Sequence, residues 1–230
     1  MHEIKSGTVA MAYSQRVLPE LLPVVLVHGG LYEGMTSREF WAETGVLGEL
    51  KAKHLTVLAP QRPAQPQSWD EERRSLLESI DAAGHDRVAL VGASNGCSTA
   101  VRLAIENPER VARMMLAWPA TVGDPVVDEL LRLIITDEAD EAAAHDLIRG
   151  ETLRGVSDAE LGALDVPVVV FPSLIENQVH QRQTLMGILA TVTDSFLVSG
   201  SPEPTDDQFL EHRSTFITMV AEFARKEHDD

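Results

Sequence analysis

A serine between two glycines, at the junction of a strand-like and a helix-like segment, is the residue best placed to do chemistry. The run VALVGA (residues 88–93) is apolar and β-branched, Ser94-Asn95-Gly96 follows, and a helical pattern continues over residues 95–107. This G-x-S-x-G spacing predicts a sharp strand-to-helix turn that holds the serine in a strained backbone conformation. Ser94 is therefore the candidate nucleophile, because the start of the helix beside it can stabilise developing negative charge.

A glycine pair earlier in the chain supplies a second part of the same chemistry. The apolar run VVLV (residues 24–27) ends in His28-Gly29-Gly30. In acyl-transfer folds, a backbone N–H after such a strand and the N–H of the residue after the nucleophile form an oxyanion hole. Here those N–H groups would belong to Gly30 and Asn95. Alone, the glycine pair would indicate only a turn, but its pairing with the serine corner favours the oxyanion role.

The elements that must position these residues alternate between short apolar runs and amphipathic segments. Strands are predicted at residues 24–28, 55–59, 88–93, 111–118, 166–171 and 195–199, with a weaker one at 8–13. Helices are predicted at residues 37–52, 70–83, 95–107, 178–191 and 206–226. This alternation predicts an α/β fold with a mostly parallel sheet covered by helices on both faces. We expect one domain over residues 1–230, with the acidic, helix-prone residues 121–164 inserted as a small helical lid.

Three stretches resemble the α/β-hydrolase family: VVLVHGG, LTVLAPQRP and GHDRVALVGASNGCSTAVRLAIENPERVARMML. The resemblance runs from about Val24 to Phe223. It implies a mostly parallel eight-stranded sheet, a lid after the sixth strand, and a triad in the chain order serine, acid, histidine. The family's usual activities are hydrolysis of esters, amides, epoxides or carbon–halogen bonds, with lyases, peroxidases and non-catalytic receptors as minorities.

The resemblance selects an acid but leaves the histidine position empty. The family's acid follows the seventh strand, which selects Glu176 in VPVVVFPSLIENQV. The histidine should follow the eighth strand, SFLVSG, yet residues 201–207 read SPEPTDD and contain none. This departure is the most informative in the sequence, because a serine without a base is a poor nucleophile.

Three histidines are alternative bases. His180 ranks first, because a loop over the catalytic edge of the sheet would bring its imidazole to Ser94 from a non-standard side. It also lies four residues after Glu176, and a helical segment would let that carboxylate orient the ring; Glu203 is an alternative orienting carboxylate. His212 ranks second, although the apolar stripe of the last helix favours a packing role for it. His28 belongs to the glycine loop and fits a structural role better. The absence of any histidine base is the remaining possibility.

Composition restricts the partners. Lys and Arg number 19 against 36 Asp and Glu, a net charge of −17 that disfavours nucleic acid and anionic membranes. The single cysteine, Cys97, excludes an intrachain disulfide, and neither a leader segment nor a membrane-spanning stretch is recognisable, so a cytoplasmic location is expected. The sequence shows no metal motif or phosphate loop, so we predict no metal or cofactor. Tyr32 and Trp118 are candidate walls of an apolar substrate pocket.

Two functions from different classes follow. The first is a serine hydrolase, esterase-like, that acts on a small neutral ester or related carbonyl substrate through Ser94. The second is a non-catalytic small-molecule binding protein, or pseudoenzyme, on the same scaffold, and its motivation is the missing histidine. A lyase that uses the same serine is a smaller third possibility.

Overall fold

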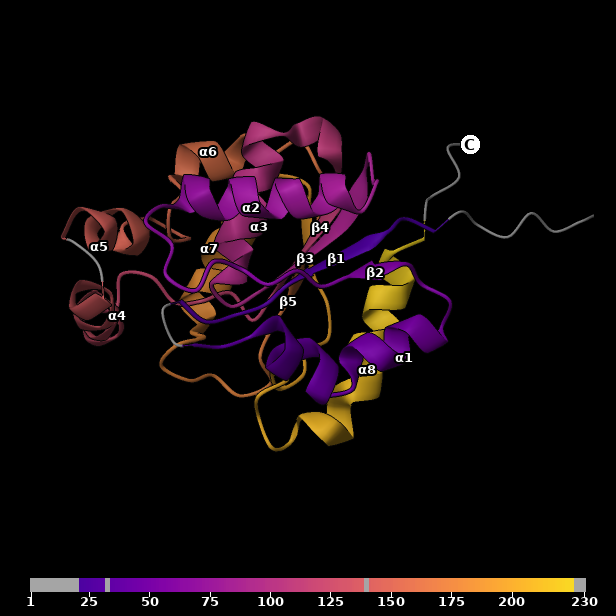
Figure 1. The fold of residues 1–230 in the computed structure, drawn as a ribbon. Coiled ribbons are helices and arrows are strands. Elements are labelled where there is room, and N and C mark those ends of the chain that lie inside the picture. Colours follow the sequence, from indigo (N-terminus) through magenta and orange to yellow (C-terminus); the bar gives the residue numbers. More distant parts are fainter. Residues whose placement is uncertain (1–20, 32–33, 139–140, 226–230) are drawn as a thin grey trace, which may run out of the picture.

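The computed structural model describes residues 21–31, 34–138 and 141–225, which form a parallel sheet between two layers of helices (Figure 1). The strand order is β2-β1-β3-β4-β5-β6, and every neighbouring pair is parallel. The strands are β1 (Val24–Val27), β2 (Val57–Leu58), β3 (Val88–Ala93), β4 (Val111–Ala117), β5 (Val168–Phe171) and β6 (Ser195–Leu197). The predicted α/β-hydrolase fold is confirmed. Six strands lie within the described residues where eight are implied, and the weak strand predicted at 8–13 falls outside them.

At least one helix lies between each pair of consecutive strands, as crossover connections between parallel strands require. They are η1 (Arg38–Glu43, a short π-helix), α1 (Val46–Ala52), α2 (Trp69–Ala82), α3 (Gly96–Glu106), η2 (Pro108–Arg110, a 3₁₀ turn), α4 (Pro125–Glu138), α5 (Glu141–Ile148), α6 (Asp158–Gly162), α7 (Arg182–Thr191) and α8 (Phe209–Phe223). Within the described ranges, no helix combines the length and apolar character needed to cross a bilayer.

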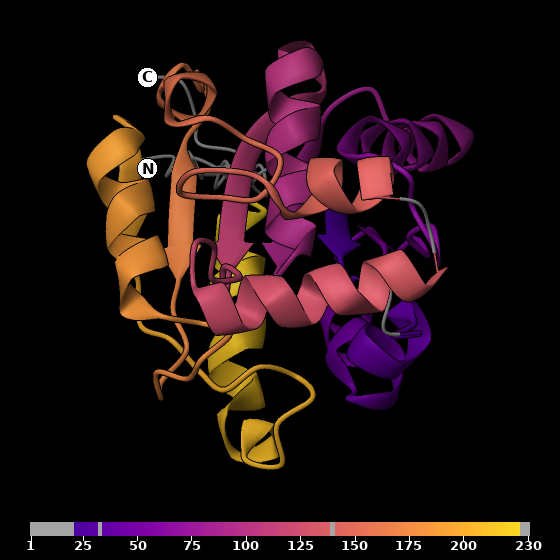
Figure 2. The same ribbon diagram turned by 90° about the vertical axis from the view of Figure 1, so that its left-hand side faces the viewer.

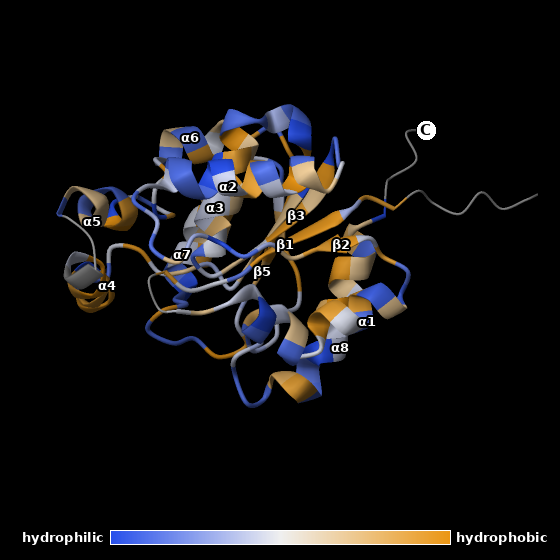
Figure 3. Cartoon of the chain, viewed as in Figure 1, coloured by the Kyte–Doolittle hydropathy of each residue, from blue (hydrophilic) through white to orange (hydrophobic). Residues whose placement is uncertain are grey.

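The sheet is buried on both faces because alternate strand residues point into two different cores. Val25 and Val27 of β1 pack with α2, α3, α6 and α7, whereas Val24 and Leu26 pack with η1, α1 and α8. Strands β1, β3 and β5 are accordingly apolar along their whole length, and the helices turn their polar sides outward (Figure 3). This arrangement brings the carboxyl ends of β1, β3, β4 and β5 to one edge, where the candidate site residues lie.

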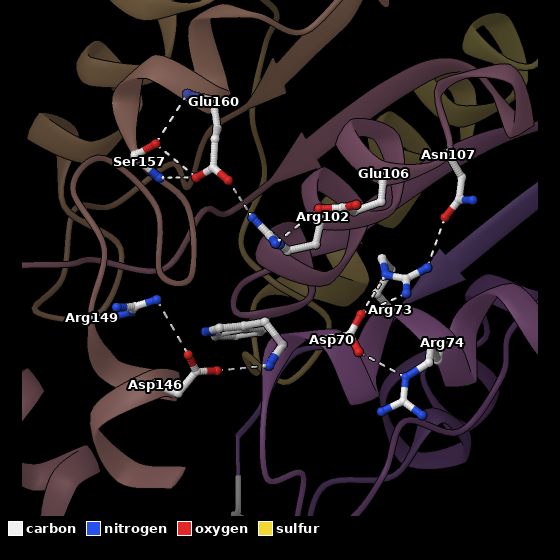
Figure 4. Close-up of polar contacts among 11 residues, drawn as sticks. Asp70, Arg73, Arg74, Arg102, Glu106, Asn107, Asp146, Arg149, Ser157 and Glu160 are labelled. Atoms are coloured by element: carbon white, nitrogen blue, oxygen red, sulfur yellow. Dashed lines mark hydrogen bonds and ion pairs between the residues drawn. The ribbon is translucent and has the colours of Figure 1, made fainter. Parts of the chain in front are cut away.

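The inserted segment (residues 121–164) forms α4, α5 and α6 at that edge. Figure 2 shows α4 passing across the carboxyl ends of the strands. Polar contacts join the segment to the body of the protein: Arg102 of α3 pairs with Glu160 of α6 at 2.8 Å, and the N–H of Trp69 donates to Asp146 of α5 at 3.4 Å (Figure 4). Because these contacts are partly exposed, each contributes little to the free energy of unfolding. Their main effect is to hold the inserted segment in position.

Two predicted helices differ from the structure, one because it is interrupted and the other because it starts later. The helix expected over 37–52 is two pieces, because Gly45 adopts a left-handed conformation (φ 84°) that ends one and begins the other. The helix expected from residue 178 begins only at Arg182, and residues 177–180 form a tight turn instead. Because α7 starts later, His180 lies in this turn and not in the helix.

Gly96 is required by the packing of the serine corner. An added Cβ would lie 2.6 Å from the backbone oxygens of both Val27 and His28. We predict that Gly96→Ala lowers the free energy of unfolding by about 1–3 kcal/mol, because neither strand oxygen can move without disturbing the sheet. Urea unfolding monitored by circular dichroism measures this change.

Gly48→Ala is the matched control. Gly48 lies inside α1, and an added Cβ there meets nothing within 4 Å. The same substitution should therefore raise the free energy of unfolding by about 0.5–1 kcal/mol through helix propensity. Equal effects of the two substitutions would contradict the steric explanation.

Candidate active site

Ser94 lies at the strand-to-helix corner that its glycines predict. Its φ is +51°, a left-handed conformation that is strained for a residue with a side chain. Its N–H donates to the carbonyl of Ala117 at 3.0 Å, which fixes the corner to the end of β4. Ser94 is half-buried and borders a cavity of about 160 Å³. The corner therefore presents the hydroxyl to a space in which a small molecule fits.

His180 contacts Ser94. Its Nε2 lies 3.1 Å from the Ser94 Oγ, and the residue is only 7% exposed. Burial lowers the pKa of His180 from its usual 6.5 to about 4, so the ring is neutral at neutral pH. A neutral imidazole can accept the hydroxyl proton through Nε2, the arrangement that a general base requires. The histidine ranked first from the sequence is the one placed beside the serine.

The chain holds His180 by hydrogen bonds on both sides of it in sequence. The buried Thr121 donates its N–H to the carbonyl of Val179 at 2.8 Å, and its Oγ1 accepts from the N–H of Gln181 at 2.9 Å. The side chain of Asn177 accepts from the N–H of His180 at 2.9 Å. The loop is thus tied to the segment that follows β4, which brings His180 to the serine from a direction the family pattern does not predict.

Glu176 does not orient His180 in this structure. It is exposed, and its Oε1 accepts from the backbone N–H of Arg182 at 3.0 Å. The predicted helical spacing from Glu176 to His180 is wrong, because α7 starts after both. Glu203, the alternative carboxylate, approaches instead: its Oε2 lies 3.8 Å from Nε2 of His180, the nitrogen that also faces Ser94. The other ring nitrogen, Nδ1, is buried and has no hydrogen-bond partner among the described residues.

The remaining sequence candidates lie elsewhere or outside the described ranges. His212 is in α8, whose apolar side packs against the sheet, so it does not take the place of His180 beside Ser94. Trp118 is fully buried among Phe171 and Phe216, and its Nε1 donates to the carbonyl of Ser201 at 2.7 Å. It packs in the core and does not border the Ser94 cavity, but it lines a neighbouring cavity that His180 also borders, so its role as a pocket wall stays a prediction. Tyr32 lies outside the described residues.

A buried arginine organises the glycine loop. Nη1 of Arg62 donates to the carbonyls of His28, Gly29 and Gly30 at 2.9, 3.2 and 2.7 Å. Its other nitrogens form a bidentate pair with Glu72 of α2, both at 2.9 Å, and both side chains are almost completely buried. Such a pair is among the stronger and more directional polar contacts in proteins.

The direction of these carbonyls bears on the proposed oxyanion hole. A trans peptide places its C=O and N–H on opposite sides, so the Gly30 N–H faces away from Arg62. Gly30 and Asn95 both border the cavity above Ser94, and a Cβ added at Gly29 would lie 3.1 Å from that of Ser94. The loop is therefore close enough for its amides to serve a reacting carbonyl, as the sequence prediction requires.

His28 has a structural position within that loop. Its Nδ1 lies 2.8 Å from the carbonyl of Gly29, and its Nε2 accepts the N–H of Arg62 at 3.2 Å. A carbonyl only accepts, so Nδ1 carries the proton and the ring is neutral. Burial and the neighbouring Arg62 lower the pKa of His28 to about 4. Both ring nitrogens are occupied, which leaves none to serve Ser94.

Arg154 is a further charged residue at the cavity that sequence reasoning missed. It comes from the inserted segment, is 1% exposed, and borders the Ser94 cavity. Its Nη1 donates to the side chain of Asn95 at 3.2 Å, and its Nη2 pairs with Asp128 at 2.8 Å. Its Nε is buried without a partner among the described residues, and burial lowers the pKa of the guanidinium.

Among the described residues, neither Cys97 nor a metal centre contributes to the site. The thiol of Cys97 is fully buried and donates to the carbonyl of Gly92, and burial raises its pKa, so it stays protonated. Within the described part of the chain, no group of three or more His, Cys, Asp or Glu side chains is arranged to hold a metal ion.

Comparison with known proteins agrees with this fold. The model of the alpha/beta hydrolase family matches residues 24–226. Among curated proteins, 2-hydroxymuconate semialdehyde hydrolase of Pseudomonas sp. (strain CF600) is 32% identical over 120 residues, covering 47% of this chain and 40% of that protein. The 2-hydroxy-6-oxo-2,4-heptadienoate hydrolase of Pseudomonas putida is 34% identical over 120 residues, covering 47% and 41%. The matches thus span about two fifths of these relatives' length.

Solved structures share the fold at lower identity. A meta-cleavage product hydrolase from Pseudomonas fluorescens IP01 superposes with a TM-score of 0.67 at 18% identity, covering 90% of this chain and 91% of that one. The esterase RhEst1 from Rhodococcus sp. ECU1013 superposes with a TM-score of 0.62 at 15% identity, covering 88% and 90%. At these identities the likeness concerns the fold.

The Arg62–Glu72 pair generates a prediction about stability. Arg62→Met leaves the Glu72 carboxylate buried without its cation, and we expect the free energy of unfolding to fall by about 3–5 kcal/mol. Chemical denaturation measures the loss. The double variant Arg62→Met/Glu72→Leu removes both charges and should be more stable than the single variant.

The same variants separate stability from loop geometry. Both lack the donor that holds the carbonyls of His28, Gly29 and Gly30, so Ser94 in both should react more slowly with a fluorophosphonate than in wild type. A double variant with restored stability and wild-type Ser94 reactivity would contradict a positioning role for Arg62.

Proposed function

Since the chain belongs to the alpha/beta hydrolase family, we propose that it is a serine hydrolase acting on a small neutral ester or related carbonyl substrate. The observation that supports this best is the 3.1 Å approach of His180 Nε2 to the Ser94 Oγ at a strained corner. A nucleophile within hydrogen-bond reach of a neutral base is the minimum that covalent catalysis requires.

The proposed reaction proceeds in two halves. The Ser94 Oγ attacks the substrate carbonyl carbon as its proton passes to Nε2 of His180, and the amides of Gly30 and Asn95 hold the oxyanion. The C–O bond to the leaving alcohol then breaks, and His180 returns the proton to that oxygen. Water, deprotonated by His180, then attacks the carbonyl carbon of the acyl-serine. The ester bond to Oγ breaks, His180 returns the proton to Oγ, and the carboxylic acid leaves.

Charged neighbours modulate the base in this scheme. A pKa of about 4 makes His180 a weak base in the resting state, because burial disfavours the imidazolium. The Glu203 carboxylate, 3.8 Å from Nε2, would attract the imidazolium that forms during the reaction. This placement would favour proton transfer at the moment it occurs, although Glu203 faces the nitrogen that a triad acid normally does not.

The proposed alternative, a non-catalytic binding protein, rests on the missing histidine after the last strand. Its motivation weakens because His180 supplies an imidazole to Ser94 from another loop. The two proposed functions differ in whether Ser94 takes part in catalytic turnover of a substrate.

Ser94→Ala tests the proposal. We expect purified wild-type protein to hydrolyse p-nitrophenyl acetate or butyrate, and Ser94→Ala to lose at least about 10³-fold in kcat/KM, because the nucleophile is gone. Equal rates in the two proteins would refute the role of Ser94. Saturable ester binding without any turnover by wild type would favour the binding-protein alternative.

A second candidate function follows from Arg154. The curated relatives are named as hydrolases of a hydroxymuconate semialdehyde and a hydroxy-oxo-dienoate, both of which carry a carboxylate. In this chain, the buried guanidinium of Arg154 borders the Ser94 cavity and has an unpartnered Nε. A substrate that carries a carboxylate in addition to its reacting carbonyl would satisfy that nitrogen, so hydrolysis of such an acid is the second proposal.

Arg154→Met distinguishes the two candidates. If the substrate carries a carboxylate, kcat/KM for a hydroxy-oxo-dienoate should fall by about tenfold or more, as expected for a lost charged hydrogen bond, while that for p-nitrophenyl butyrate changes little. Asp128→Asn, which removes the carboxylate beside Arg154, should not lower kcat/KM for the acidic substrate in the same way. Equal losses on both substrates would indicate a structural role for Arg154.

A further inference from the structure

A second cavity, of about 280 Å³, adjoins His180 and is not bordered by Ser94. His180 lines this cavity as well as the one above the serine. The walls of the second cavity come from the loops after β4 and β5, the first turns of α7 and the end of β6. It lies where the chain leaves β5, the part of the fold from which the resemblance expects the triad acid.

The protonation of His180 leaves one ring nitrogen without a partner. When Nε2 accepts from the Ser94 hydroxyl, the single proton of the neutral ring sits on Nδ1. Nδ1 is buried and makes no hydrogen bond within the described residues. An unsatisfied buried donor costs about 1–3 kcal/mol, so an acceptor at Nδ1 would stabilise the base-competent form of the ring.

The chemistry of the second cavity suits a small anion with an apolar tail. Arg182 borders it, and α7 begins at this residue, so the positive end of the helix dipole is nearby. Leu174, Met186 and Leu197 also border it, and each is about half exposed. Apolar side chains left open around a cation are typical of a site for an amphiphilic ligand.

We propose that this cavity binds a short-chain monocarboxylate, one oxygen of which accepts the Nδ1 proton of His180. The ligand would take the place that an acid of the chain normally takes in a triad. Other charges around the ring are Glu203 near Nε2 and Glu176 at the cavity wall, and the latter is held by the N–H of Arg182. Binding does not require catalysis, whereas any acceleration of Ser94 rests on the proposed function.

Butyrate is the probe, and the imidazole nitrogens of His180 are the readout. Protein labelled with ¹⁵N-histidine is titrated with sodium butyrate at constant ionic strength and near-neutral pH, and His180 is assigned by its loss in His180→Gln. We expect a saturable change of the Nδ1 resonance of His180. The rate of Ser94 labelling by a fluorophosphonate, measured in parallel, should rise severalfold with the same saturation.

Variants place the ligand in the cavity. Met186→Trp fills its rim and should weaken butyrate by about tenfold or more, because the tail loses its space. Leu210→Trp, at an exposed apolar position in α8 that does not border the cavity, is the control and should bind as wild type does. Arg182→Gln should weaken binding about two- to fivefold, as expected for one partly solvated charge.

Three outcomes overturn the proposal. The first is an unchanged Nδ1 resonance at all butyrate concentrations, and the second is an equal response in Met186→Trp and wild type, which would place butyrate in the Ser94 cavity. The third is a change of the free His180 resonance in Glu176→Gln with no response to butyrate in wild type, which would make Glu176 the source of the carboxylate. Butyrate binding to a protein whose Ser94 is inert would support the site while the proposed function fails.

Discussion

The buried pair between Arg62 and Glu72 is the constraint on which the rest of the site depends. It joins the loop after β1 to α2, and through its three carbonyl contacts it sets the direction of the peptides beside Ser94. The desolvation cost of two buried charges is large, so the pair is useful only while both partners and the loop carbonyls are in place. Arg62 and Glu72 thus hold the glycine loop, His28 and, through that loop, the serine corner in place.

The second constraint is the delivery of an imidazole from an unexpected loop. Residues 201–207, in the loop after β6, carry no histidine, and the turn before α7 supplies His180 instead. Thr121 makes this possible, since it binds both neighbours of His180 and is itself buried beside β4. An imidazole delivered from this loop does not meet the acid that the family pattern places on its far nitrogen, and Nδ1 has no hydrogen-bond partner among the described residues.

Sequence reasoning succeeded where the signal is local. The run from Val88 to Glu106 combines a buried strand, a glycine-flanked serine and an amphipathic helix, and the structure has β3 and α3 within a residue of the predicted bounds. The fold class followed because the strands are short and mainly apolar and every connection between them contains a helix. His180 ranked first because its loop could reach Ser94 from a non-standard side, and its Nε2 lies 3.1 Å from the Ser94 Oγ; the helical spacing to Glu176 is wrong.

The rest depends on contacts between residues distant in the chain. Arg62 and Glu72 belong to a loop and a helix whose sequences carry no sign that both charges are buried together. Arg154 comes from a glycine-flanked stretch of the inserted segment, where an arginine normally faces solvent. Trp118 ends a strand, and its indole packs in the aromatic core away from the Ser94 cavity, in a residue with a left-handed backbone (φ +49°). Such outcomes are set by tertiary packing.

The central claim, that His180 activates Ser94, is tested most directly by the pH dependence of fluorophosphonate labelling of Ser94. Protonation removes the acceptor at Nε2, so the rate should fall as the pH drops through the pKa of His180, with a midpoint near 4. We expect His180→Gln to abolish labelling and His212→Gln to leave it unchanged. A midpoint near 6.5, or undiminished labelling of His180→Gln, would contradict the account.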